Sequence, residues 1–138
     1  MKIQKKFHTI AGVAELLAVS EKSVRRLIDV EIIPCVMSTI GPRIHRDDLL
    51  GYVQNILNQY AEEETGQLPK EIRENPQLIT IEAAQCALDC SRSKVRNLIE
   101  VGAVAACRVG RLIRILAESM EQFQSEKIFQ FIKKSTVR

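Results

Sequence analysis

The sequence predicts a mainly α-helical protein of two similar small domains, each with two short helices, a β-hairpin and a longer C-terminal helix. Residues 9–57 and 80–128 align at a constant offset of 71 positions without an insertion. Within each copy, apolar residues recur at helical spacing, and glycine or proline marks the hairpin turn. A repeat of this length suits a small domain better than a solenoid unit. The identical pairs are Thr9/Thr80, Ile10/Ile81, Leu17/Leu88, Ser20/Ser91, Val24/Val95, Arg25/Arg96, Leu27/Leu98, Ile28/Ile99, Val30/Val101, Arg43/Arg114 and Ile44/Ile115.

The repeat divides the 138 residues into two domains and a connector. We expect the first domain over 1–64, an acidic, proline-containing linker over 65–77, and the second domain over 78–138. With 46% hydrophobic residues the chain is globular rather than disordered. A domain of about 60 residues has only a marginal core by itself. Each repeat must therefore pack on the other, on a partner, or on its own long helix.

The first repeat has helix signals at two short segments and one long one. We expect helices over 10–18 and 21–30, the second of them capped by Ser20. A hairpin over 32–46 follows, with its turn at 38–42. A longer helix should then run over 47–64.

The second repeat follows the same order. Its predicted helices span 81–88 and 92–101, its hairpin spans 104–115, and its last helix spans 117–134. Gly110 stands at the predicted hairpin tip. Two short helices joined by a tight turn form a helix-turn-helix, and a hairpin directly after them makes it winged. The predicted architecture is therefore a tandem pair of winged helix-turn-helix domains.

Charge is distributed unevenly along the chain, whose net charge is +3. Residues 1–60 carry eight basic and six acidic side chains, and residues 78–138 carry ten and six. The stretch 61–77 between them has two basic and five acidic residues. Two basic lobes suit nucleic-acid binding without requiring it. Few aromatic residues (4%) disfavour single-strand or RNA recognition, which relies on stacking.

The second helix of each repeat has its polar and basic residues opposite its apolar stripe. In a helix-turn-helix this helix enters the major groove, and the wing contacts the adjacent backbone or minor groove. A single arginine can also be a solvated charge, hairpin arginines can simply keep a sheet edge soluble, and Arg43 and Arg114 suit structural ion pairs equally well. The predicted DNA-contacting residues are Lys22, Ser23, Arg25, Arg26, Arg43, Arg92, Ser93, Lys94, Arg96, Asn97, Arg108, Arg111 and Arg114.

Residues 79–84, 90–102 and 108–115 of the second repeat resemble the excisionase-type winged helix, a relative of the MerR-type DNA-binding domain. The resemblance implies double-stranded DNA binding, side by side on direct repeats, by an architectural factor in excision or a transcriptional regulator. Such proteins come from phages, plasmids, conjugative elements and bacteria. The first repeat departs from the pattern, because Glu21 follows the helix cap and residues 37–41 replace a basic wing. A weaker first DNA site is therefore expected.

Enzyme chemistry and cofactor sites have no clear signal. We find no Ser-His-Asp set, no paired carboxylates and no glycine-rich phosphate loop, so neither catalysis nor a cofactor is expected. The spacing of Cys86 and Cys90 would permit a metal, but there is no C-x-x-C pair or nearby histidine. We expect all four cysteines to be reduced, with Cys86, Cys90, Cys35 and Cys107 in the core.

No apolar run approaches the roughly 20 residues that span a bilayer, and no apolar signal core follows the basic N-terminus. We therefore expect a cytoplasmic, nucleoid-associated protein without a membrane partner. An alternative class is a protein-interaction or dimerisation module. In that case the long helices over 47–64 and 117–134 would present apolar stripes to a partner or to a second copy.

Overall fold

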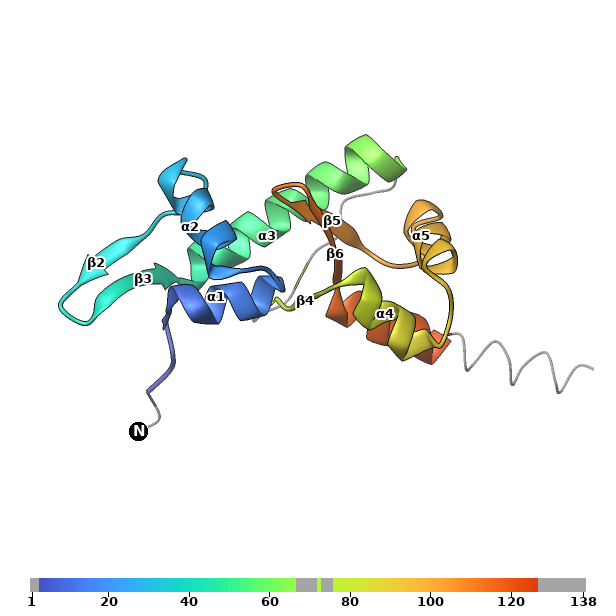
Figure 1. Cartoon of the computed structure of the whole chain (residues 1–138), viewed down its shortest axis with the longest axis horizontal. Coiled ribbons are helices and arrows are strands. Elements are labelled where there is room, and N and C mark those ends of the chain that lie inside the picture. Colours follow the sequence, from blue (N-terminus) through green and yellow to red (C-terminus); the bar gives the residue numbers. More distant parts are fainter. Residues whose placement is uncertain (1–2, 67–71, 73–75, 127–138) are drawn as a thin grey trace, which may run out of the picture.

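The computed structural model describes residues 3–66, 72 and 76–126, and it contains both predicted repeats (Figure 1). The described chain is largely helical with two small antiparallel sheets. The first repeat consists of β1 (Phe7–His8), α1 (Ile10–Leu17), α2 (Glu21–Asp29), β2 (Val36–Ser38), β3 (Gly41–His45), α3 (Arg46–Tyr60) and a closing π-helical turn, η1 (Ala61–Thr65).

The second repeat begins after the connector and repeats this order. Residues 117–126 form its last described helix, and the rest of the predicted span, 127–134, lies outside the described residues. The predicted helix positions are thus confirmed to within one or two residues where the structure describes them. The other elements are β4 (Leu78–Ile79), α4 (Ile81–Leu88), α5 (Arg92–Glu100), β5 (Ala106–Val109) and β6 (Leu112–Leu116).

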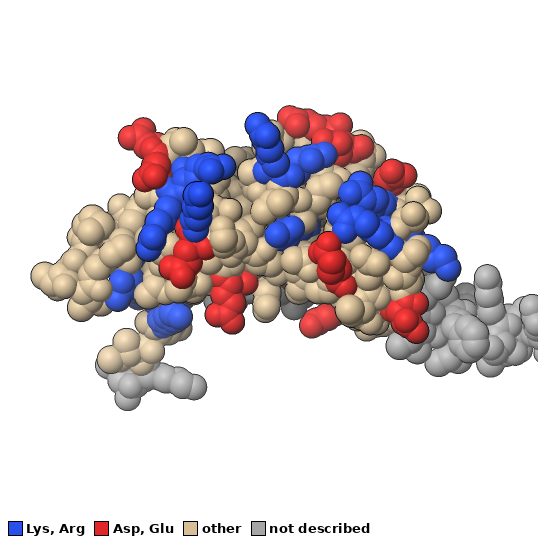
Figure 2. Space-filling model, viewed as in Figure 1, with Lys and Arg blue, Asp and Glu red and all other residues tan. Residues whose placement is uncertain are grey.

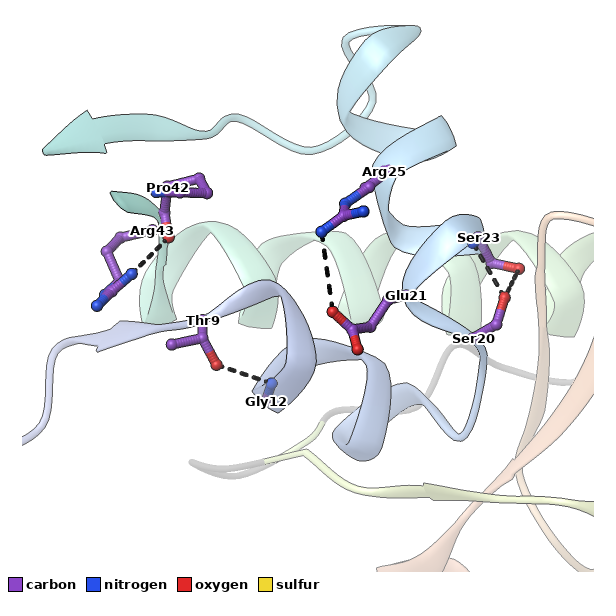
Figure 3. Close-up of polar contacts among 8 residues, drawn as sticks. All are labelled: Thr9, Gly12, Ser20, Glu21, Ser23, Arg25, Pro42 and Arg43. Atoms are coloured by element: carbon purple, nitrogen blue, oxygen red, sulfur yellow. Dashed lines mark hydrogen bonds and ion pairs between the residues drawn. The ribbon is translucent and has the colours of Figure 1, made fainter. Parts of the chain in front are cut away.

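Four hydroxyl caps start the four short helices, and the predicted cap at Ser20 is among them. The Oγ1 of Thr9 accepts a hydrogen bond from the amide of Gly12 at 3.0 Å, and Ser20 Oγ accepts one from the amide of Ser23 at 3.1 Å (Figure 3). Thr80 and Ser91 make the equivalent contacts in the second repeat. Each contact satisfies an amide that the first turn leaves without a partner.

Each sheet has three strands, in the orders β1-β3-β2 and β4-β6-β5. The sequence predicted only the hairpin strands, because β1 and β4 are two residues long and carry no alternating pattern. The first hairpin turn is also tighter than predicted. Ser38 pairs with Gly41, so Pro42 lies in β3 rather than in the turn.

The hairpin of the second repeat contributes residues to the cores of both repeats. Alternate residues of a strand point to opposite faces of its sheet. Ala106 packs in the core of the second repeat, whereas its neighbour Cys107 packs in the core of the first. The first core therefore draws on both repeats. Its members from the second are Leu78, Ala105, Cys107, Val109 and Leu116.

Helix α3 lies against strand β5 and supplies the other side of this shared core. Its Val53 and Leu57 are almost fully buried. A hydrogen bond from Arg114 Nε to the carbonyl of Ala18 at the end of α1, 2.8 Å long, adds a polar contact between the repeats. The two repeats are therefore not linked by the connector alone.

The cysteines divide into buried and accessible groups. Cys107 is fully buried, and burial raises the pKa of its thiol to about 12. The core prediction is wrong for Cys86, which is exposed because it lies on the outer side of α4, and Cys35 and Cys90 are only half-buried. Among the described residues, no group of three or more potential metal ligands comes together.

The end of α2 offers a stability prediction with a matched control. Glu31 has φ +61°, where its counterpart in the second repeat is Gly102 with φ +74°. Left-handed backbone strains a side-chain-bearing residue, and glycine avoids this strain. We expect Glu31→Gly to stabilise the fold by about 1 kcal/mol. Thermal melts should show a higher midpoint for Glu31→Gly and a lower one for Gly102→Ala; a lower midpoint for Glu31→Gly would contradict the strain.

Candidate nucleic-acid interface

Helices α2 and α5 present equivalent exposed faces because each buries one side. In α2 the buried residues are Val24 and Leu27, and in α5 they are Val95 and Ile99. The polar residues are left on the outside, and both helices carry more basic than acidic residues. The exposed side chains predicted to contact DNA are Lys22, Arg25, Arg26, Arg92, Ser93, Lys94, Arg96 and Asn97. Ser23 is half-buried, with its hydroxyl 3.0 Å from Ser20 Oγ.

Two of these arginines have acidic partners. A guanidinium nitrogen of Arg25 lies 3.9 Å from Glu21 (Figure 3), and one of Arg92 lies 2.8 Å from Glu82. A hydrogen bond from its own backbone amide and one from Arg92 lower the pKa of the exposed Glu82 carboxyl. Both pairs are exposed and hence weak. The remaining basic residues form no ion pair within the described chain: Lys22, Arg26, Lys94 and Arg96.

The three arginines of the second hairpin have different environments. Arg108 pairs with Glu64 at 3.1 Å and lies over the ring of Tyr60, 5.7 Å from its centroid. Arg114 is half-buried and bonded to backbone carbonyls. Arg111 is exposed at the tip and forms no ion pair with a described residue. Of the three, Arg111 alone is both exposed and without an ion pair or hydrogen bond to a described residue.

Arg43 and Arg114, an identical pair in the alignment, make the same local contact. Arg43 Nη1 donates to the carbonyl of Pro42 at 2.9 Å (Figure 3), and Arg114 Nη1 donates to the carbonyl of Ile113 at 2.8 Å. Neither forms an ion pair with a described residue. Their shared identity therefore has a structural explanation in hydrogen bonds to backbone carbonyls.

The tip of the β5–β6 hairpin lies between α2 and α5 (Figure 1). On one side, Arg111 lines a groove with Ser23 and Arg26 of α2. On the other side, it lines a groove with Arg92 and Arg96 of α5, together with Glu82 and Arg114. Figure 2 shows basic side chains over α2, near this tip and over α5 on a single face. The sequence could not predict the groove beside α2, because it brings together residues of different repeats.

Chemically, this face offers cationic hydrogen-bond donors from α2, α5 and the β5–β6 tip. No helix in the described part of the chain is long and apolar enough to cross a membrane. Neither a scan of protein-family models nor searches of curated proteins and of solved structures found a match. The function is therefore inferred from the residues and their arrangement.

Proposed function

We propose that the protein binds double-stranded DNA through α2, α5 and the β5–β6 tip, as a tandem pair of winged helix-turn-helix units. One observation carries the proposal. Two equivalent serine-capped helices expose basic side chains on one face, most of them without an ion pair to a described residue, and the exposed Arg111 lies between the two helices. Cationic side chains that neutralise phosphates supply most of the affinity in such complexes.

The proposed mode of binding places α2 and α5 in major grooves. Arg96 and Asn97 of α5 have the donors that bases and phosphates accept, and the helix N-terminus adds amides directed at a phosphate. Because both helices belong to one chain, the second contact is intramolecular and raises the total affinity. The resemblance described above makes an excisionase-like architectural factor or a transcriptional regulator the favoured role.

The experiment that tests the proposal is selection of random duplex DNA by the full-length protein, followed by sequencing. We expect an enriched motif with two related half-sites, spaced near one helical turn, about 10 base pairs, if both helices follow one face of the duplex. Binding to the selected duplex should weaken steeply with salt, because counterions are released from the phosphates. A selection that enriches no motif, with equal weak binding to every duplex, would contradict sequence-specific binding.

A protein-interaction role is the second candidate, and one observation favours it. The hairpin β2–β3 exposes Val36, Met37 and Ile40, with 50%, 74% and 73% of their surface accessible. The apolar stripe of α3 is not available to a partner, because its residues Leu49, Val53 and Leu57 are buried within the chain. Light scattering on wild type and on the variant with Met37→Lys and Ile40→Lys would test it, since self-association through this surface should be lost in the variant.

A further inference from the structure

We infer that the hairpin of the second repeat also serves the DNA-contacting helix of the first, by holding one backbone phosphate between Arg26 and Arg111. This rests on the proposed DNA binding and adds to it a specific site. In a simple tandem each wing would assist its own helix. Here the β5–β6 tip extends to α2, so the first half of the interface is built from both repeats.

The geometry of one groove carries the inference. Arg26 comes from the last turn of α2 and Arg111 from the β5–β6 tip, and both line this groove with Ser23 and Gly110. Both arginines are exposed and have no ion-pair partner among the described residues. Two like charges that share a groove repel each other, and an anion bound there would relieve the repulsion. A phosphate suits two guanidinium groups because it accepts several charge-assisted hydrogen bonds.

The first repeat has no basic wing of its own that could do this. At the positions equivalent to Arg108 and Arg111, its hairpin has Met37 and Ile40, both largely exposed. Neither side chain can neutralise a phosphate. The hairpin β2–β3 also lies far from the β5–β6 tip (Figure 1). The arginine missing from the first hairpin is supplied to α2 by the second.

Contacts along the two strands of the hairpin fix the position of its tip. Cys107 and Val109 of β5 are buried in the core shared with α3. Arg114 of β6 donates to the carbonyl of Ala18, just before α2. These contacts hold the tip beside α2. The backbone at Arg111 is therefore already held beside α2, so only the side chain has to be ordered when it binds a phosphate.

A double-mutant cycle on the selected duplex tests whether the two arginines share one phosphate. We expect Arg26→Ala and Arg111→Ala each to weaken binding about tenfold and to reduce the salt slope by about one unit. The double variant should bind about as weakly as either single variant, and its slope should also fall by one unit. Independent phosphates would instead give about a hundredfold loss and a slope lower by two units, and this would overturn the inference.

Two control experiments separate this site from DNA binding in general. Arg26 and Lys94 do not line the same groove. The losses of affinity in Arg26→Ala and Lys94→Ala should therefore multiply in the double variant. Ile40→Ala, at the position of the first repeat equivalent to Arg111, should leave both affinity and slope unchanged; a loss equal to that of Arg111→Ala would overturn the inference. If wild type binds the duplex and the cycle is additive, this site is wrong and the proposed function stands. If the wild-type protein binds no duplex, the proposed function and this phosphate site are both wrong.

Discussion

Leu57→Ala is expected to destabilise both repeats together by about 2–5 kcal/mol. Leu57 is 1% exposed and belongs to the core that α3 shares with β5. Removing its side chain deletes apolar contacts and leaves a cavity that the packed neighbours fill only in part. Because residues of both repeats line this core, the loss should reach the second repeat although Leu57 lies in the first.

Denaturant unfolding with one probe in each repeat measures this coupling. Tyr52, which is buried in the first core, reports on the first repeat by fluorescence in a Tyr60→Phe background, since the chain has no tryptophan. Alkylation of Cys90, which packs against the core of the second repeat, reports on that repeat when it is followed by mass spectrometry. We expect the two transitions to coincide in wild type and to shift together in Leu57→Ala.

The exposed Met37 provides the matched control. Met37→Ala should change the free energy of unfolding by less than about 0.5 kcal/mol, as surface substitutions usually do. Two separate transitions, with only the tyrosine signal shifted by Leu57→Ala, would show instead that the repeats fold independently.

The local elements could be predicted from the sequence because their signals are local. Ser20 and Ser91 mark helix starts through hydrogen bonds that span three residues, and apolar spacing marks the buried sides. The candidate residues on α2 and α5 followed from the same periodicity. These positions need no knowledge of how the repeats pack.

The packing between the repeats could not be predicted, because the 71-residue repeat suggests that aligned positions have the same environment. Cys107 aligns with the exposed Val36, yet it is buried, since only the second hairpin has α3 against its outer face. The packing of α3 on the second hairpin alone also determines which of the hairpin arginines has an ion-pair partner. Arg108 pairs with Glu64 of the first repeat, a contact 44 residues apart that no pattern within one repeat contains. Equivalent positions therefore have different roles.

Arg96→Ala should weaken binding to the selected duplex about tenfold or more, a loss of ~1–3 kcal/mol if the guanidinium contacts a base. Arg96 is exposed on α5 and lines the groove beside Arg111, without an ion pair to a described residue. Its guanidinium therefore has no ion pair with a described residue to break before it binds DNA. Because it is exposed, its removal should leave the thermal midpoint nearly unchanged.

Arg108→Ala is the matched control for Arg96→Ala, since both remove one exposed arginine of the second repeat. Arg108 is already engaged by Glu64 and the ring of Tyr60, so a phosphate would have to displace those contacts. We expect its loss to change DNA affinity less than threefold. Competition titrations with mutated half-sites then show how Arg96 contributes to the affinity. Relaxed specificity at one base pair indicates that Arg96 contacts a base. Uniform weakening with a lower salt slope indicates that it contacts a phosphate. An Arg96→Ala variant that binds as tightly as wild type would remove α5 from the interface.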